Sequence, residues 1–385
     1  MSSDKSTIKY LYENIIQDQI MCVEYLRQNN LLPTKDVNNI VCSKVNDDGI
    51  KCGGQLCEKE TTRTNEKIKH ISQSTYEKIV SCSRQECQAS QSIQSRSKFF
   101  TYTDLNEKFQ SNLSLTNIME LIWFWAQRIP VESVVQLTAR SEQSIRDWYN
   151  LCTDVTVDQY YKRQKMGGPS RIVQINGFLY QRTHSYDRGN YDPDINAYVE
   201  NSEDDTASSD NGENTNSNSD GNTDEDSENK APLENNQQRF ETPRLRLGPW
   251  IFGLCCVLDS NIECRFFIVQ NMDKQTLLPI IKREVEIGTT IYSEQCLAYS
   301  TLNDHGFIHE TVNHSLDMFE PNTGAHIETI KPLLKRINIK YNIKIRKGNP
   351  LIHRKLQEEW WRSCHPSPSQ IFEEFLADLM ATYEM

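Results

Sequence analysis

Four cysteines in the first quarter of the chain have the residue type and spacing of metal ligands. They form two pairs that are far apart in the sequence, Cys42 with Cys52 and Cys82 with Cys87. Two such pairs can supply four thiolates at tetrahedral angles, as in a zinc ribbon. The nine residues between Cys42 and Cys52 are acceptable if residues 43–51 loop out, because loop-closure entropy grows slowly with length. We expect a zinc-ribbon-like module over 41–95, with Cys57 as the competing ligand and free or buried thiols as the alternative.

A second group of polar side chains lies at the predicted start of a helix. Ser141, followed by Ser144, is an N-cap signal, because a serine side chain can accept an unpaired backbone N–H of the first turn. In a helix-turn-helix protein, the N-terminal side chains of the second helix contact bases and phosphates. The candidate DNA-binding residues are Arg140, Gln143, Ser144 and Arg146. A three-helix packing module with a solvated polar face is the alternative.

Helical periodicity surrounds this cap and supports a helix-turn-helix region over 96–165. One predicted helix carries its apolar stripe at Ile118, Leu121, Ile122 and Trp125, and a second follows Pro130. Near the N-terminus, residues 7–29 have the spacing of one amphipathic helix that ends before Pro33, so we assign 1–40 to an N-terminal helix. Helical spacing returns in the C-terminal tail, 351–385.

Strand patterns dominate the chain after Gly167-Gly168. Apolar runs at 172–180, 250–257, 264–269 and 289–292 predict strands, and residues 275–285 and 326–339 predict helices. Three strands in succession followed by helix, strand and helix are typical of a mixed α/β domain of the RNase H type. We place this RNase H-like domain at 166–191 and 239–350.

An acidic segment interrupts this domain. Residues 192–238 consist mainly of Asn, Ser, Asp, Glu and Gly, and we expect a disordered acidic insert. Asp192 to Glu228 contains 13 acids and no Lys or Arg, so the chain's net charge of −11 becomes +2 without it. The remainder can therefore carry a basic face that binds DNA. The alternative to a merely solvated loop is an insert that covers this face and weakens DNA binding.

The cysteine count and the N-terminal sequence indicate in which kind of cellular compartment the protein folds. The chain has 12 cysteines, no leader-like segment in its first twenty residues, and no apolar run of the roughly 18 residues that a membrane span needs. A reducing compartment without a membrane partner is therefore expected, in which Cys255 and Cys256 act as small buried hydrophobes.

Three blocks of residues resemble the catalytic blocks of Merlin-type DDE transposases and their bacterial insertion-sequence relatives. The third block contains Asn313-His314-Ser315, residues 320–326 and Thr329-Ile330-Lys331. The second runs from Pro279 through Gly288 to Gly306, and the first from Gly167 to Phe178. Cys82–Cys87, Trp148-Tyr149 and Trp360-Trp361-Arg362 also resemble family elements. The last of these suggests either core capping or an arginine near DNA.

The resemblance implies three metal-binding carboxylates, and this chain departs from that pattern. Asn176, Glu294 and Lys331 stand at the three positions. Mg²⁺ prefers hard anionic oxygens, whereas an amide is neutral and an ammonium repels a cation. We therefore expect no productive binding of Mg²⁺ or Mn²⁺, with Lys331 acting as the counter-ion of Glu294. Glu328 is the substitute acid in the alternative interpretation.

The family motif also supplies Asn313, His314, Gly324 and His326, which either contact phosphate or serve turns and packing. What the resemblance implies overall is a nuclear, transposase-derived protein that binds terminal-repeat-like or chromosomal DNA, as a homodimer or with a partner transposase. The departures predict that cleavage and strand transfer are lost. The alternatives are an active DDE nuclease that uses Glu294 and Glu328, and a protein-interaction scaffold without DNA binding.

Overall fold

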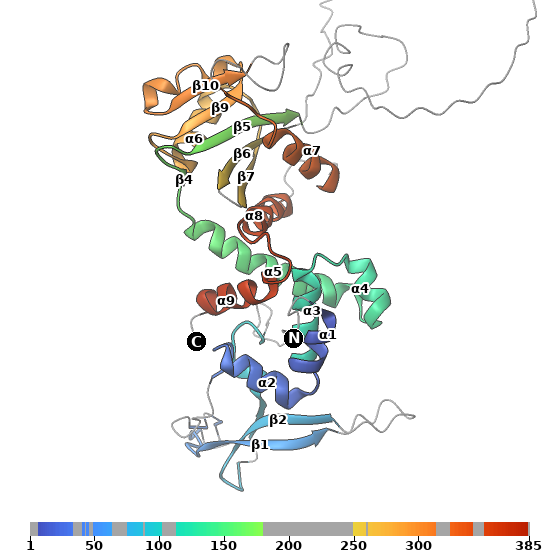
Figure 1. Cartoon of the computed structure of the whole chain (residues 1–385). Helices are drawn as coiled ribbons and strands as arrows, with labels where there is room; N and C mark the ends of the chain where they lie inside the picture. Colours follow the sequence, from blue (N-terminus) through green and yellow to red (C-terminus); the bar gives the residue numbers. More distant parts are fainter. Residues whose placement is uncertain are drawn as a thin grey trace, which may run out of the picture. The chain divides into compact units, whose positions relative to one another are not determined.

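A computed structural model gives the fold of this chain (Figure 1). It describes residues 7–33, 41–42, 44–45, 49–63, 75–87, 89–101, 113–179, 249–258, 261–312, 324–341 and 350–383. The acidic insert predicted at 192–238 and the motif residues Asn313 and His314 lie outside the described residues. No helix in the described ranges is both long and apolar enough to cross a membrane.

The N-terminal segment forms two helices, α1 (Ile8–Asn14) and α2 (Gln19–Gln28), so the prediction of one continuous helix was wrong. The cause is Asp18, whose carboxylate accepts the backbone N–H of Met21 at 2.8 Å and starts a second helix. The predicted apolar face is nevertheless the buried one. Leu11, Val23 and Leu26 are all fully buried.

A small antiparallel sheet follows, with the order β1-β2-β3. Its strands are β1 (Leu56–Arg63), β2 (Thr75–Cys82) and β3 (Ser90–Ser92), and a 3₁₀ helix η1 (Ile93–Arg96) comes next. The first two strands pair from Leu56 opposite Cys82 to Arg63 opposite Thr75. Strand β2 therefore ends at Cys82, one of the predicted metal ligands.

The central helices are α3 (Leu115–Ala126), α4 (Val131–Thr138) and α5 (Glu142–Lys162), with α9 (Ile371–Tyr383) at the C-terminus. They share one core with the N-terminal helices, and its largest buried side chains include Trp148, Trp361 and Phe375. The predicted cap of α5 is present, because Ser144 donates its backbone N–H to the Ser141 hydroxyl at 3.2 Å. Ala139, in the left-handed region at φ 53°, makes the turn between α4 and α5.

The predicted mixed α/β domain is present and contains a five-stranded sheet in the order β10-β9-β5-β6-β7. The pairs β5–β6 and β6–β7 are antiparallel, whereas β9 is parallel to both β5 and β10. The strands are β5 (Ile172–Leu179), β6 (Trp250–Leu258), β7 (Asn261–Val269), β9 (Thr290–Glu294) and β10 (Ile308–Val312). The last strand was not predicted from the sequence.

The remaining elements of this domain are two short strands and several helices. Strands β4 (Met166–Gly167) and β8 (Val285–Glu286) pair with each other. The helices are α6 (Lys274–Glu284), η3 (Leu297–Tyr299), η4 (Asn303–His305), α7 (Ile330–Tyr341) and α8 (Pro350–Cys364). Helix α7 begins four residues later than the predicted 326–339, because Ala325 and Ile327 are buried in the irregular segment that precedes it.

Alternating side chains cover the two faces of the sheet. Phe252 and Leu254 face a core shared with α6, whereas Ile251 and Cys255 face a core shared with α7 and α8. Gly253 allows α7 to approach closely, since a Cβ there would lie 2.9 Å from a Leu334 methyl group. This close packing brings the start of α7 to the sheet.

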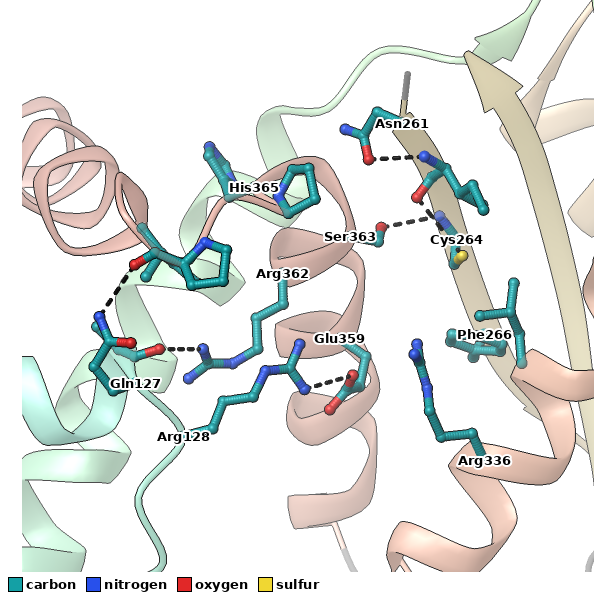
Figure 2. A pocket seen from close by; sticks show the side chains of 16 residues that line it. Gln127, Arg128, Asn261, Cys264, Phe266, Arg336, Glu359, Arg362, Ser363 and His365 are labelled. Carbon is teal, nitrogen blue, oxygen red and sulfur yellow. Dashed lines mark hydrogen bonds and ion pairs between the residues drawn. The ribbon is translucent and has the colours of Figure 1, made fainter. Parts of the chain in front are cut away.

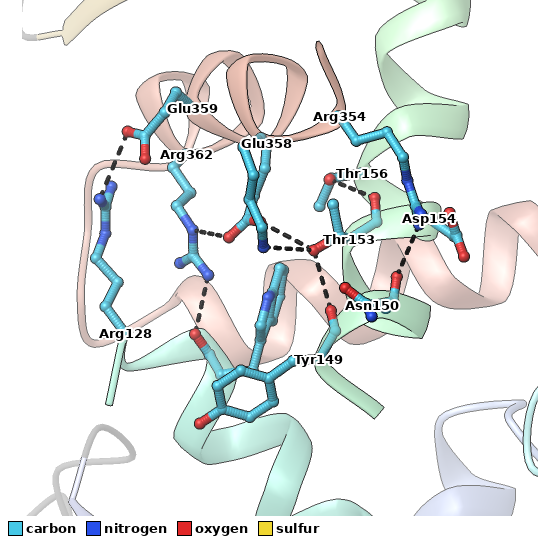
Figure 3. A network of polar contacts seen from close by, with 12 residues as sticks. Arg128, Tyr149, Asn150, Thr153, Asp154, Thr156, Arg354, Glu358, Glu359 and Arg362 are labelled. Carbon is cyan, nitrogen blue, oxygen red and sulfur yellow. Dashed lines mark hydrogen bonds and ion pairs between the residues drawn. The ribbon is translucent and has the colours of Figure 1, made fainter. Parts of the chain in front are cut away.

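Helix α8 belongs to two cores at once. Ile352 and Leu356 pack in the core of the sheet domain, while Trp361 packs in the helical core. One turn of α8 carries the buried Arg362, which donates to the carbonyl oxygens of Trp125 at 2.9 Å and Ala126 at 3.1 Å. Its guanidinium also donates to Glu358 at 2.9 Å (Figure 3). Arg362 thus caps the C-terminus of α3, so its role is core capping rather than contact with DNA.

Candidate functional site

Three elements bring Asn176, Glu294 and Lys331 together. In the parallel pair β5–β9, Gln174 lies opposite Tyr292, so Asn176 and Glu294 are level two residues further along. Lys331 lies in the first turn of α7, which packs on the same face of the sheet. Positions that are more than 150 residues apart in the chain therefore meet at one point.

One carboxylate oxygen holds this cluster together. The Lys331 ammonium lies 2.8 Å from Glu294 Oε1, and the Asn176 amide donates to the same oxygen at 3.3 Å. The expected ion pair between Lys331 and Glu294 is thus present. The side chains of Lys331 and Glu294 are 24% and 27% exposed, so water reaches the pair. Asn176 Oδ1 accepts the backbone N–H of Gly177 at 2.7 Å, which fixes the orientation of the amide.

Gln174 positions Lys331, and sequence reasoning missed it. Its side-chain oxygen accepts the backbone N–H groups of Thr329 at 3.1 Å and Ile330 at 3.0 Å. These are unpaired donors at the start of α7, so a buried side chain from β5 caps the helix that carries the ammonium. A polar residue between the buried apolar residues Val173 and Ile175 was the available signal.

The acid proposed as a substitute, Glu328, does not share a helical face with Lys331. Helix α7 begins at Ile330, and Glu328 lies exposed in the turn before it. Glu328 and Lys331 therefore do not lie on one turn of the helix. The difference follows from the late start of the helix.

The two described members of the family motif make local contacts. Gly324 has a left-handed backbone at φ 72°, and its carbonyl oxygen lies 3.2 Å from His326 Nδ1. The ring of His326 packs edge-on against Tyr292, with 5.6 Å between the ring centres. Ser293 follows Tyr292 on β9, and its Oγ lies 2.8 Å from Nε2 of His309. No sequence pattern indicated this histidine. Burial lowers its pKa.

The four predicted cysteine ligands form one buried cluster. The sulfurs of Cys42, Cys52, Cys82 and Cys87 all lie within 4.8 Å of one another. The Cys42–Cys87 and Cys52–Cys82 sulfur distances are 3.6 Å and 3.7 Å. Four thiolates around zinc at about 2.3 Å would lie about 3.8 Å apart, so the cluster fits a metal ion such as zinc. Cys57 lies on β1 outside this cluster.

The long first spacing is accommodated by a small hairpin. Val41 bridges Gln55 and Val45 bridges Lys51, which returns the chain to bring Cys52 beside Cys42. Gly54 is required because a Cβ there would lie 2.5 Å from the Cys82 sulfur. The expectation that residues 43–51 loop out is consistent with these bridges.

Backbone donors act on two of the four cysteines, with opposite net results. The Arg84 N–H, 3.4 Å from the Cys82 sulfur, lowers the pKa of that thiol, but burial and the neighbouring thiols outweigh it and raise the pKa to about 11. A hydrogen bond from the Ala89 backbone N–H lowers the pKa of Cys87 to about 7. Donors of this kind favour the thiolate, which is the form that binds a metal ion.

The candidate DNA-binding residues differ in how they are engaged. Arg140 pairs with the buried Glu120 at 2.5 Å and donates to Asn117 Oδ1 at 2.8 Å, and only 17% of its side chain is exposed. It therefore joins the α4–α5 turn to α3. Gln143, Ser144 and Arg146 lie on the first turns of α5.

The side chains of Gln143 and Arg146 contact other side chains on the surface of α5 and α4. Gln143 donates to Asp147 Oδ1 at 2.7 Å. Arg146 pairs with Glu142 at 2.5 Å and with Glu132 at 3.4 Å, and 48% of its side chain is exposed. The arginine can leave these exposed partners at little cost, because such surface pairs contribute about 1 kcal/mol or less.

A hollow of about 430 Å³ lies beside α8 (Figure 2). Its buried acid, Glu359, pairs with Arg128 at 3.6 Å and also contacts Lys340 and the Tyr341 hydroxyl. Burial would raise the pKa of Glu359, but Lys340 and Arg128 outweigh it and the pKa is lowered. Glu359 is thus a structural anion rather than a candidate general base.

Comparison with protein families places these observations in context. Residues 199–347 match the family model described as the ISXO2-like transposase domain. The match includes β6 to α7, and with them Glu294 and Lys331. No curated protein matches the chain. The mixed sheet is consistent with this match, which supports a DDE-type transposase domain over the matched residues.

Proposed function

We propose that this protein is a transposase-derived DNA-binding protein that does not cleave or join DNA. The observation that carries the proposal is the ion pair of Lys331 with Glu294, 2.8 Å apart. The sheet order, with three antiparallel strands followed by two parallel ones, supports an RNase H-like domain. Within such a domain, Asn176, Glu294 and Lys331 correspond to the three metal-binding positions of the family.

This residue set does not fit a pair of divalent cations. Two-metal phosphoryl transfer needs several anionic oxygens that bridge and hold both ions. The cluster offers one carboxylate, one neutral amide and one ammonium. Two like unit charges about 4 Å apart repel by roughly 4 kcal/mol near a protein surface, and a divalent ion is repelled more strongly. Lys331 therefore takes the place of a cation beside Glu294.

DNA binding is supported by two other regions. One is α4–α5, which we take as the helix-turn-helix, because Ser141 caps α5 and Arg146 on its first turns is exposed. The four-cysteine cluster beside β1–β3 has the donor set of a zinc ribbon, in which zinc would hold two loops together. The family's action on DNA implies a nuclear location and assembly as a homodimer or with a partner transposase.

The proposal is tested by measuring DNA binding and nicking together. Duplex and hairpin ends are incubated with the protein in Mg²⁺ or Mn²⁺. We expect salt-sensitive binding without nicking by the natural protein. The triple variant Asn176→Asp, Glu294→Asp, Lys331→Glu is the positive control. Metal-dependent nicking by the natural protein would contradict the proposal, and an absence of all DNA binding would favour a protein-interaction scaffold.

A further inference from the structure

A cleft along β7, the edge strand of the sheet farthest from β10, combines arginines with one exposed aromatic ring, Tyr161. The cleft has a volume of about 660 Å³ and is lined by the end of α5, by β7, by α6 and by α8. This volume lies within the range of roughly 300–1,000 Å³ that is typical of ligand sites. Arg265 and Phe267 alternate along β7 with Phe266, which faces the α7 side.

The cleft carries an excess of positive charge. The Glu284 carboxylate receives three guanidinium groups, from Arg163 at 2.6 Å, Arg265 at 2.8 Å and Arg283 at 2.7 Å. Arg265 has a second acid, Glu263, at 2.6 Å. With Lys165, four cations therefore face two acids. The buried Arg163 and Arg265 are matched by Glu284 and Glu263, so the excess positive charge is carried by the exposed Arg283 and Lys165.

Two cations of the cleft can reach a ligand. The Arg283 side chain is 61% exposed, and its guanidinium lies 5.5 Å from the centre of the Phe267 ring. Lys165 is also exposed and donates to the Lys282 carbonyl oxygen at 2.9 Å. Together they provide charged donors at the mouth of the cleft, while Arg163 and Arg265 form its fixed charged interior.

The aromatic wall is supplied by Tyr161. This residue is 72% exposed, although its neighbour Tyr160 is buried. The two rings meet edge to face with 5.9 Å between their centres, and Gln357 of α8 lies 3.5 Å from the Tyr161 hydroxyl. An exposed ring that is held on its edge leaves a flat face for stacking. Exposed aromatic faces beside a cationic groove are the combination that binds single-stranded nucleic acid.

We propose that this cleft binds one strand of nucleic acid, with phosphates on Arg283 and Lys165 and a base stacked on Tyr161. A single strand fits better than a duplex because stacking on a side chain requires an unpaired base. The inference rests on the proposed DNA-binding function and adds a second contact, separate from α5's first turns and from Lys331.

The test uses full-length protein and a fluorescein-labelled oligothymidylate, with binding followed by fluorescence anisotropy over a range of salt. Tyr161→Ala should weaken binding by roughly 5- to 100-fold, the usual range for loss of one stacked base, whereas Tyr161→Phe keeps the ring and should bind within about twofold of the natural protein. Arg283→Ala should lower the salt dependence, log Kd against log salt, by about 0.7 for each lost phosphate contact.

Two controls separate this inference from the proposed function. Lys9→Ala removes an exposed lysine that pairs with Glu13 far from the cleft and should leave strand binding unchanged. Arg146→Ala should weaken binding of a duplex but not of the oligothymidylate. Strand binding that is absent, or that is indifferent to both Tyr161→Ala and Arg283→Ala, overturns the inference even if duplex binding persists. The inference also fails if a peptide of residues 192–228, and not the oligonucleotide, responds to these substitutions.

Discussion

The ammonium of Lys331 lies 2.8 Å from the carboxylate of Glu294, at the level of the sheet where Asn176 donates to the same oxygen. Three elements have to be in place for this contact, namely β5, β9 and the capped start of α7. The pair is therefore a property of the folded domain, and it gives a positive charge a fixed position beside the one remaining acid.

Gln174 should be required for the position of α7. Gln174→Met keeps the side-chain length but leaves the buried N–H groups of Thr329 and Ile330 without their acceptor. We expect the free energy of unfolding to fall by roughly 1–3 kcal/mol, as measured by urea titration. Gln143→Met, on the exposed first turn of α5, is the matched control and should change it by less than about 0.5 kcal/mol. If Gln174→Met lowers the free energy of unfolding no more than Gln143→Met does, the Gln174 cap does not stabilise the fold.

The cysteine cluster should bind one metal ion through four thiolates. Protein purified without chelator should contain about one zinc per chain, measured by mass spectrometry of the metal content. Cys82→Ser should remove the zinc and lower the melting temperature. Cys57→Ser changes a cysteine outside the cluster and should keep both. Loss of zinc from the Cys57 variant, with retention by the Cys82 variant, would reassign the ligands.

Glu358 should stabilise the fold in a pH-dependent way. Burial would raise its pKa, but Arg362 and Lys355 outweigh this and lower the pKa from 4.5 to about 2. Because the folded-state pKa is the lower one, the stabilisation is complete above the unfolded pKa and is lost as the pH falls from about 4.5 towards 2. The shift corresponds to roughly 3 kcal/mol at neutral pH.

The variant Glu358→Gln tests this directly. It should lower the free energy of unfolding by roughly 3–5 kcal/mol at pH 7, because it leaves the buried Arg362 without its carboxylate. The difference from the natural protein should narrow as the pH falls below about 4.5. Glu132→Gln, whose side chain is 70% exposed, is the control and should cost less than about 0.5 kcal/mol. A pH-independent difference would contradict the assignment.

The acidic insert should weaken DNA binding through its charge. A variant in which the 13 acids of residues 192–228 are replaced by Asn and Gln keeps the length and removes the charge. We expect it to bind duplex DNA more tightly than the natural chain at low salt. The gain should shrink as salt rises, because the screening length falls from about 30 Å at 0.01 M to about 10 Å at 0.1 M. An unchanged affinity at low salt would exclude an inhibitory role.

Periodicity predicted the elements that pack through one continuous apolar face. Strand β5 and helix α3 were found in this way, because Val173 and Ile175, like Ile118 and Ile122, are buried at the expected spacing. Strand β10 was missed because its residues, Ile308 to Val312, alternate weakly and only Val312 is buried. The break before α2 depended on one capping side chain, which a periodic pattern does not detect.

The site was predictable as far as residue types and family blocks define it. The four-cysteine cluster and the Lys331–Glu294 ion pair were both expected, and each is present in the structure. Arg140 was expected among the DNA contacts, but its commitment to Glu120 depends on how α3 packs against the α4–α5 turn. Gln174 was missed for the same reason, since its partners belong to a helix more than 150 residues later.

The central claim is that the Glu294 pocket does not bind divalent metal, and a Mn²⁺ titration followed by electron paramagnetic resonance tests it most directly. Zinc-loaded natural protein should leave the signal of free Mn²⁺ unchanged, whereas the Asn176→Asp, Glu294→Asp, Lys331→Glu variant should take up manganese. Stoichiometric binding of Mn²⁺ by the natural protein, abolished by Glu294→Gln, would contradict the account.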